Sequence, residues 1–285
     1  MILVTGATGT VGRLVVERLP NTLPVRILTR NPHRAVALSG PQTDIVGGDF
    51  EDPSSLRRAL AGVTTALLVT VDPLTPTHDT NFLAAARAAG VRHVVKLSAE
   101  AVSDPGATDL ITEWQRENER QLRASRLSWT LLRPRAFMTN TLGWARSIRA
   151  DGVVRVVHGA APNATIDPRD IADVAALVLA EPEAHSQRTY ALTGPTALTA
   201  AEQTEILADL LNRPLLFEDM SDTQAACLLL ERYPARVAQA LLESGARGIL
   251  GTKSDIHPTV SKLLGRPARS YRTWAVDHLE SFRMQ

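Results

Sequence analysis

The sequence of 285 residues has little cysteine, little lysine and no long apolar run. Its one cysteine, Cys227, excludes an internal disulfide and any metal site built from several cysteines. Because Cys227 lies in an apolar run, we expect a buried thiol and not a nucleophile. The histidines form no cluster with metal-ligand spacing, so no metal site is predicted.

Charge and hydropathy exclude further classes. The net charge of +1 gives no field that would favour direct binding to nucleic acid or to an acidic membrane. No apolar segment approaches the length that spans a membrane, and the N-terminal residues lack the basic region of a signal peptide. We therefore expect a cytoplasmic protein. With 28 arginines and only three lysines, the composition suggests a bacterial source.

The most specific motif is Thr-Gly-Ala-Thr-Gly-Thr-Val-Gly at residues 5–12. An apolar run precedes it and an apolar helical pattern follows it, and a strand, a glycine-rich turn and a helix in this order predict a dinucleotide site. Gly6 allows the sharp turn, Gly9 lets a pyrophosphate approach, and Gly12 lets the helix pack closely on the strand. The cofactor-binding residues predicted here are Gly6, Thr8, Gly9, Thr10, Val11 and Gly12.

Apolar runs alternate with helical patterns through most of the chain. The predicted strands cover residues 2–4, 25–29, 44–46, 66–71, 93–97, 129–132 and 190–192. Helices are predicted from Gly9, near Pro32 and from Pro53, and over 78–89, 108–125, 135–150, 168–180 and 199–211. This alternation predicts an α/β fold of the Rossmann type, with a doubly wound parallel sheet and helices on both faces. The last third of the chain is mostly helical in pattern.

The end of the second predicted strand indicates which dinucleotide binds. Folds selective for NAD usually have Asp or Glu there, whereas this chain has Arg30, with Arg34 close behind. An arginine stabilises a 2′-phosphate through charge-assisted hydrogen bonds, which favours NADP(H) over NAD(H). The alternative is that Arg30 and Arg34 are solvated loop residues.

Further candidate binding residues follow the ends of the third, fourth and fifth predicted strands. Asp49 and Phe50 follow the third strand, at a loop that borders the adenine in this architecture. We expect the Asp49 carboxylate to accept a hydrogen bond from the adenine amine. The alternative is that it only caps the next turn. Thr70 and Ser98 end the fourth and fifth strands. Since ligands bind at the carboxyl edge of such sheets, we expect both to contact the cofactor, and Ser98 to lie near nicotinamide or substrate.

Several further motifs match one family. They are Arg30-Asn31-Pro32, Gly48-Asp49, Leu97-Ser98, Leu132-Arg133-Pro134 and Asp170-Ile171-Ala172. With the glycine motif, and over nearly its whole length, the chain resembles the NmrA-like group of atypical short-chain dehydrogenases. The resemblance implies a Rossmann domain of residues 1–135 with about 160–195, and a small, mostly helical substrate lobe of about 136–159 and 196–285. The group includes quinone and azo reductases and proteins that sense the cofactor without turning it over.

The usual catalytic pair of short-chain dehydrogenases is missing. In that family a tyrosine donates a proton, and a lysine four residues later lowers its pKa. By alignment the pair falls on Ile111 and Gln115, and neither can do this. The remaining candidates are Ser98, Gln115 as a hydrogen-bonding residue, Glu119 and His78. Glu119 is expected to orient a substrate or a neighbouring arginine, with a structural role as the alternative. For His78, a candidate acid, the alternative is that it only begins a helix.

A quinone or a conjugated acceptor takes a hydride and collects its proton from water, so it does not need that pair. We therefore expect an enzyme, an NADP(H)-dependent reductase of a small apolar or aromatic acceptor such as a quinone, an enone or a natural-product intermediate. Phe137, Met138, Asn140 and Trp144 are expected to line its pocket, unless they are ordinary lobe packing. Two alternatives stay open, a cofactor sensor without chemistry and a non-redox tailoring enzyme. A homo-oligomer is also left open.

Overall fold

The structure is a computed structural model that describes residues 1–283, and it divides into two compact units. The first unit comprises Met1–Val102, Trp114–Arg133 and Pro168–Ala191. The second comprises Ser103–Glu113, Pro134–Asp167 and the chain from Leu192 onward. Among the described helices, none is both long enough and apolar enough to cross a membrane.

A seven-stranded sheet in the order β3-β2-β1-β4-β5-β6-β8 forms the centre of the first unit. Its strands are β1 (Ile2–Thr5), β2 (Val25–Thr29), β3 (Thr43–Gly47), β4 (Thr65–Leu68), β5 (His93–Leu97), β6 (Ser128–Pro134) and β8 (Arg188–Leu192). Neighbours from β3 to β6 pair in parallel. The predicted Rossmann-type fold is confirmed. The fourth strand is shorter than predicted, because the Val69 amide donates to the Thr5 hydroxyl and leaves the ladder.

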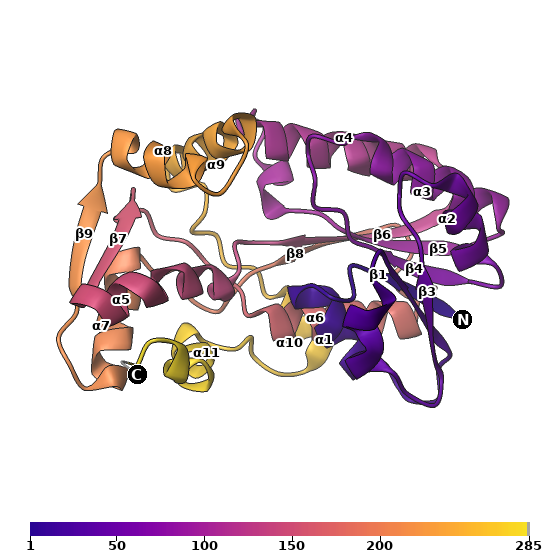
Figure 1. The fold of residues 1–285 in the computed structure, drawn as a ribbon, viewed down its shortest axis with the longest axis horizontal. Coiled ribbons are helices and arrows are strands. Elements are labelled where there is room, and N and C mark those ends of the chain that lie inside the picture. Colours follow the sequence, from indigo (N-terminus) through magenta and orange to yellow (C-terminus); the bar gives the residue numbers. More distant parts are fainter. Residues whose placement is uncertain (284–285) are drawn as a thin grey trace. The chain divides into compact units, whose positions relative to one another are not determined.

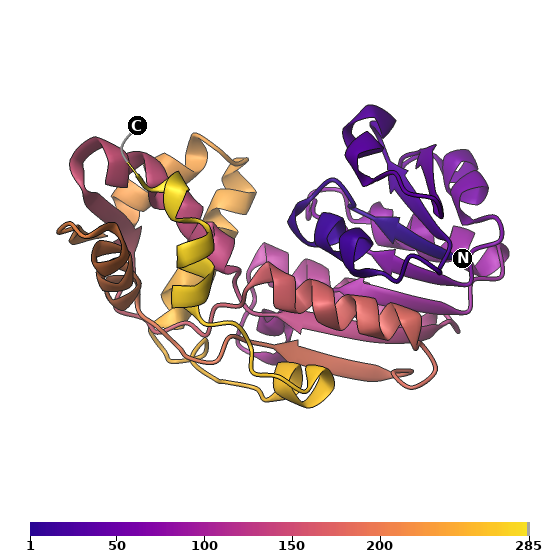
Figure 2. The same ribbon diagram turned by 90° about the horizontal axis from the view of Figure 1, so that it is seen from below.

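Helices cover both faces of this sheet (Figure 1). On one face lie α1 (Thr10–Arg18) and α6 (Pro168–Ala180), which pack on each other. On the other lie α2 (Pro53–Leu60), α3 (Thr77–Ala88) and α4 (Leu110–Ala124), and Figure 2 shows the α6 side in the turned view. The segment near Pro32 forms a 3-10 helix, η1 (Pro32–Leu38), in place of the predicted α-helix, and it buries only Ala35. A second short 3-10 helix, η2 (Glu100–Ser103), follows β5.

The strand order creates a switch point between β1 and β4. After β3 the chain crosses to the far side of β1, so the connections that leave β1 and β4 run to opposite halves of the sheet. In open α/β sheets the ligand crevice lies at the carboxyl ends of the two strands that flank this point. Here those ends carry the glycine-rich turn and residues 69–71.

The second unit combines helices with a small sheet that was not predicted. Its helices are η3 (Met138–Trp144), α5 (Ala145–Asp151), α7 (Ala200–Leu211), α8 (Asp222–Leu230), α9 (Ala235–Gly248), α10 (Thr259–Leu264), α11 (Tyr271–Asp277) and η4 (Leu279–Ser281). Strands β7 (Val153–Val157) and β9 (Leu216–Met220) pair in parallel. A capping box between Thr199 and Glu202 opens α7. Trp274 and Phe282 are fully buried in the core of this unit.

The expectation that Cys227 is buried is wrong, because its thiol is exposed. Helix α8 buries only Ala225, and Leu228 and Leu230 are 47% and 54% exposed. The apolar run around Cys227 therefore faces away from the core of its unit.

Candidate functional site

The glycine-rich turn between β1 and α1 has the geometry of a dinucleotide cradle. Gly6 has a φ of +63° and packs on Val69, where an added Cβ would lie 3.0 Å from the Val69 Cβ. A Cβ on Gly12 would lie 2.3 Å from the Gly6 carbonyl oxygen, so no side chain fits there. At Gly9, the N-cap of α1, an added Cβ would meet only that oxygen, at 3.2 Å. Gly12 thus serves the fold, whereas the missing side chain of Gly9 leaves room for a group outside the chain.

The surface of the turn suits a bound pyrophosphate. Thr8, Gly9 and Thr10 are exposed, while Val11 and Gly12 are buried beneath the helix start. The first backbone amides of a helix lack partners within it and carry a partial positive charge. The residues present therefore fit a dinucleotide, with the phosphates at the start of α1.

Two predicted cofactor residues, Arg30 and Arg34, are exposed beyond the end of β2. Neither guanidinium forms a hydrogen bond or an ion pair with another residue in the described part of the chain. Both remain available to an anion such as a 2′-phosphate.

Asp49, Phe50 and His78 come together beyond the end of β3. The rings of Phe50 and His78 have their centroids 5.3 Å apart. The Asp49 carboxylate accepts from the Glu51 amide at 3.0 Å, so the turn-capping alternative is observed. One ligand atom each from Asp49, Glu51 and His78 lie within 4.8 Å of one another, a grouping that sequence spacing did not reveal. Exposed acidic groups of this kind are common without an ion, and we assign no metal to them.

This location removes His78 from the candidate proton donors near Ser98. Asp49 follows β3 and Ser98 follows β5, and the strand order separates them by four strand spacings of about 4.8 Å, or about 19 Å in all. His78 contacts Phe50 on the β3 side of the edge. We therefore do not retain it as an acid beside the nicotinamide.

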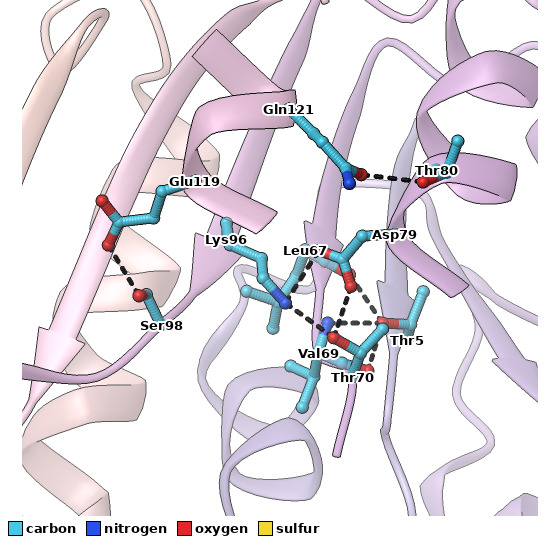
Figure 3. Close-up of polar contacts among 10 residues, drawn as sticks. All are labelled: Thr5, Leu67, Val69, Thr70, Asp79, Thr80, Lys96, Ser98, Glu119 and Gln121. Carbon is cyan, nitrogen blue, oxygen red and sulfur yellow. Dashed lines mark hydrogen bonds and ion pairs between the residues drawn. The ribbon is translucent and has the colours of Figure 1, made fainter. Parts of the chain in front are cut away.

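Ser98 and Glu119 lie together, as Figure 3 shows. The Ser98 hydroxyl donates to Glu119 Oε1 at 2.6 Å. Arg133 on β6 donates from Nε and Nη2 to the two carboxylate oxygens of Glu119, at 2.8 and 2.6 Å. A bidentate arginine pair of this kind forms strong charge-assisted hydrogen bonds and fixes the orientation of the carboxylate. The expected contact between Glu119 and a neighbouring arginine is thus observed, and Glu119 also holds the Ser98 hydroxyl.

Two buried amide side chains on α4, near Glu119, have polar atoms without hydrogen-bond partners among the described residues. Gln115 is 7% exposed, and its Oε1 has no hydrogen-bond partner among the described residues. Asn118 is 1% exposed, and neither polar atom of its side chain has one. Gln115 lies one helical turn before Glu119 on the same face, and Asn118 lies three residues after Gln115, beside it on the helix surface. Since buried polar atoms nearly always have partners, these amides are candidates for contact with a ligand. Asn118 was not predicted, because a single asparagine in a helix forms no recognisable motif.

A buried ion pair supports the loop after β4 (Figure 3). Lys96 Nζ lies 3.0 Å from Asp79 Oδ2 and donates to Thr70 Oγ1 at 2.7 Å. The Thr70 hydroxyl in turn donates to Asp79 Oδ1 at 2.6 Å. From the other side, Thr5 Oγ1 accepts from the Val69 amide at 2.8 Å. The Thr70 hydroxyl therefore has an internal role, in which it fixes the loop beside the glycine-rich turn, and the contact of Thr70 with the cofactor stays a prediction.

The four predicted pocket residues in the second unit divide into two groups. Met138 is 1% exposed and belongs to the core of that unit, and Trp144 packs against the same core. For these two the packing alternative is observed. Phe137 is half-buried and Asn140 is exposed, so these two remain candidates for contact with a substrate.

Comparison with known proteins identifies the family. The sequence profile of the NAD(P)H-binding family matches residues 6–182, a span that includes most of the glycine-rich turn and most of the large sheet. The chain belongs to this family. The match confirms the resemblance to NmrA-like atypical short-chain dehydrogenases that the motifs indicated.

Relatives named as reductases match the chain over nearly its whole length. The (4-alkanoyl-5-oxo-2,5-dihydrofuran-3-yl)methyl phosphate reductase of Streptomyces griseus is 50% identical over 282 residues, which cover 99% of each chain. The NAD(P)H azoreductase of Xenophilus azovorans is 34% identical, again over 99% of each. A crystal structure of the NADPH-dependent quinone oxidoreductase of Escherichia coli with NADPH superposes with a TM-score of 0.87 at 29% identity, covering 98% of this chain and 100% of that one.

This similarity along the whole chain makes the protein an NAD(P)H-dependent reductase of a small-molecule acceptor, as predicted from the sequence. The sensor and the non-redox enzyme are not retained.

Proposed function

We propose that the protein uses NADPH to reduce the conjugated carbon–carbon double bond of a small unsaturated lactone, supplied as its phosphate ester. The observation that carries the proposal is the 50% identity, over 99% of both chains, with a reductase named for such a compound. That name describes a ring double bond with two carbonyl groups attached to one of its carbons.

The residues in the Tyr-Lys positions support this class of acceptor. The bound dihydronicotinamide supplies a hydride. A double bond conjugated with a carbonyl group accepts it at the β carbon, the electron pair moves to the carbonyl oxygen, and the enolate then takes a proton from water. No side chain with a tuned pKa is needed for this step, which agrees with Ile111 at the position of the usual tyrosine.

The buried amides of α4 have the chemistry to assist. Negative charge develops on the carbonyl oxygen as the hydride arrives, and fixed hydrogen-bond donors at such an oxygen lower the barrier. The side-chain NH2 groups of Gln115 and Asn118 are donors of this kind. In this proposal one of them binds the substrate carbonyl and the other the carboxamide of the cofactor. The hydrogen bond between Ser98 and Glu119 holds α4 against the end of β5.

Selectivity for NADPH is assigned to the loop after β2. The free guanidinium groups of Arg30 and Arg34 offer bidentate donors to a 2′-phosphate. No acidic residue stands at the end of β2 to receive ribose hydroxyls in the manner of NAD-selective folds.

An acceptor series tests the proposal. NADPH and NADH oxidation by the purified protein is followed with an acylated butenolide phosphate, a benzoquinone and a saturated ketone. We expect the butenolide to be reduced fastest, the saturated ketone not at all, and NADPH to be preferred. Faster turnover of the saturated ketone, or tight NADPH binding without turnover of any acceptor, would overturn it.

A further inference from the structure

A hydroxyl group with a fixed orientation lies at the end of β5, at the carboxyl edge of the large sheet. The Ser98 amide donates to the Leu132 carbonyl on β6 at 2.8 Å, which holds the Ser98 backbone in place. Its hydroxyl donates to Glu119 Oε1 on α4 at 2.6 Å (Figure 3). Arg133, also on β6, donates to both carboxylate oxygens of Glu119. Three elements of the first unit thus fix the direction of one O–H bond.

The direction of this hydrogen bond decides what Ser98 offers to a third group. A guanidinium has donors only, so both oxygens of Glu119 act as acceptors toward Arg133. A serine hydroxyl has one hydrogen and two lone pairs, and the hydrogen of Ser98 is directed to Glu119. Within the described part of the chain no group donates to Ser98 Oγ, and Ser98 is 5% exposed, so little water reaches it. Toward a ligand, Ser98 Oγ is therefore an acceptor and not a donor.

The position of β5 in the sheet indicates which half of the cofactor meets this acceptor. The phosphates fit the start of α1, which follows β1, and the 2′-phosphate fits the loop after β2. In the order β2-β1-β4-β5, strand β5 lies on the other side of β1, two strand spacings or about 10 Å away. A dinucleotide that crosses the switch point therefore directs its nicotinamide half toward the ends of β4 and β5.

We propose that Ser98 Oγ accepts a hydrogen bond from the carboxamide NH2 of the nicotinamide, and that Glu119 is the positioning residue that keeps the Ser98 hydrogen turned away from it. The carboxamide supplies the N–H donors of the nicotinamide ring. An acceptor whose direction is fixed before binding loses little conformational freedom when the cofactor arrives. The inference goes beyond the proposed function, because it concerns the cofactor and holds for any acceptor.

The same geometry excludes Ser98 as a donor to the substrate carbonyl. Its only hydrogen is held by Glu119, so stabilisation of the developing negative charge is left to the amide side chains of α4. The proposed contact also sets the orientation of the carboxamide, with its NH2 group toward the end of β5.

The contact is tested by removing the donor from the ligand and the acceptor from the protein. The ligands are NADP⁺ and its 3-acetylpyridine analogue, in which a methyl group replaces the carboxamide NH2, and calorimetry gives the Kd of each. Ser98→Ala should raise the Kd for NADP⁺ about 2- to 10-fold, the range for one neutral hydrogen bond, and leave the Kd for the analogue nearly unchanged. Comparing both ligands in both proteins isolates the contact, because other differences between the ligands cancel.

Glu119→Gln tests the positioning role. A glutamine side chain has one acceptor oxygen, so its NH2 group then faces either Ser98 or Arg133, and the Ser98 hydrogen is no longer fixed. This variant should narrow the preference for NADP⁺ over the analogue although Ser98 is still present. A purely structural role of Glu119 would weaken the binding of both ligands equally. Ser261→Ala removes an exposed hydroxyl on α10 and should match the wild type in both Kd values.

Two results would overturn the inference. If Ser98→Ala raises both Kd values by the same factor, Ser98 contacts another part of the cofactor, such as a ribose hydroxyl, or only supports the fold. If neither Kd changes, Ser98 does not contact the cofactor. Unfolding curves show whether each variant is folded, and if Glu119→Gln is not, the comparison of Ser98→Ala with the wild type decides alone. None of these results depends on the acceptor, so the proposed function stands or falls separately with the acceptor series.

Discussion

Replacing Lys96 by methionine removes one half of the ion pair that supports the cofactor edge. The side chains of Lys96 and Asp79 are 0% and 1% exposed, so neither charge is shielded by solvent. Methionine fills similar space but leaves the Asp79 carboxylate buried without its cation. Removing one partner of a buried pair costs about 3–5 kcal/mol, a large share of the roughly 5–15 kcal/mol that stabilises a typical protein. We therefore expect Lys96→Met to lower the free energy of unfolding by about 3–5 kcal/mol.

Urea unfolding at neutral pH, followed by circular dichroism, measures this loss. The double variant Lys96→Met/Asp79→Leu should recover most of it, because no uncompensated charge then remains in the interior. Lys262→Met is the surface control and should lie within about 0.5 kcal/mol of the wild type. A loss below about 1 kcal/mol in Lys96→Met, or a double variant as unstable as the sum of the two single variants, would refute the reasoning.

Three further predictions concern the cradle, the cofactor and pH. Gly9→Asp should fold but lose NADPH binding in calorimetry, whereas Gly12→Ala should lower the unfolding free energy, since its Cβ would lie 2.3 Å from a backbone oxygen. Arg30→Ala should weaken NADPH binding by about 1.5–3 kcal/mol and leave NADH nearly unchanged, and equal losses would show that it does not contact the 2′-phosphate. Because the pKa of Lys253 falls from 10.5 to about 8 in the folded protein, the unfolded chain binds more protons between these values. Its contribution to stability should therefore rise with pH across that interval, and Lys253→Met should abolish this rise in unfolding experiments.

The large sheet could be predicted because parallel strands buried on both faces appear as short apolar runs. The expected bounds of β2 and β5 are those observed, and the helix predicted over 168–180 is α6. The small sheet of the second unit could not be predicted in this way. Strand β9 has the sequence Leu-Phe-Glu-Asp-Met, and three of its five residues are exposed, so it lacks both an apolar run and a regular alternation.

The candidate site divides along similar lines. The glycine-rich turn could be predicted because its residues are close in the sequence and their spacing alone defines the turn. Lys96 was missed because its partner, Asp79, meets it only when the strands and helices pack. Asn118 was missed because the burial of its unpaired amide also appears only in the packed fold. Thr70 and Met138 were assigned to ligands from their positions in the sequence. Their side chains instead belong to the interior, since neighbouring elements cover them more completely than the pattern indicated.

The fate of the transferred hydride tests the central claim most directly. The protein is supplied with NADPH carrying deuterium at the transferable position of the nicotinamide, together with an acylated butenolide phosphate, and the product is examined by NMR. We predict one deuterium at the ring carbon β to the carbonyl groups, with the neighbouring carbon protonated from water. Deuterium on a former carbonyl carbon, or a product without deuterium while NADPH is consumed, would contradict the account.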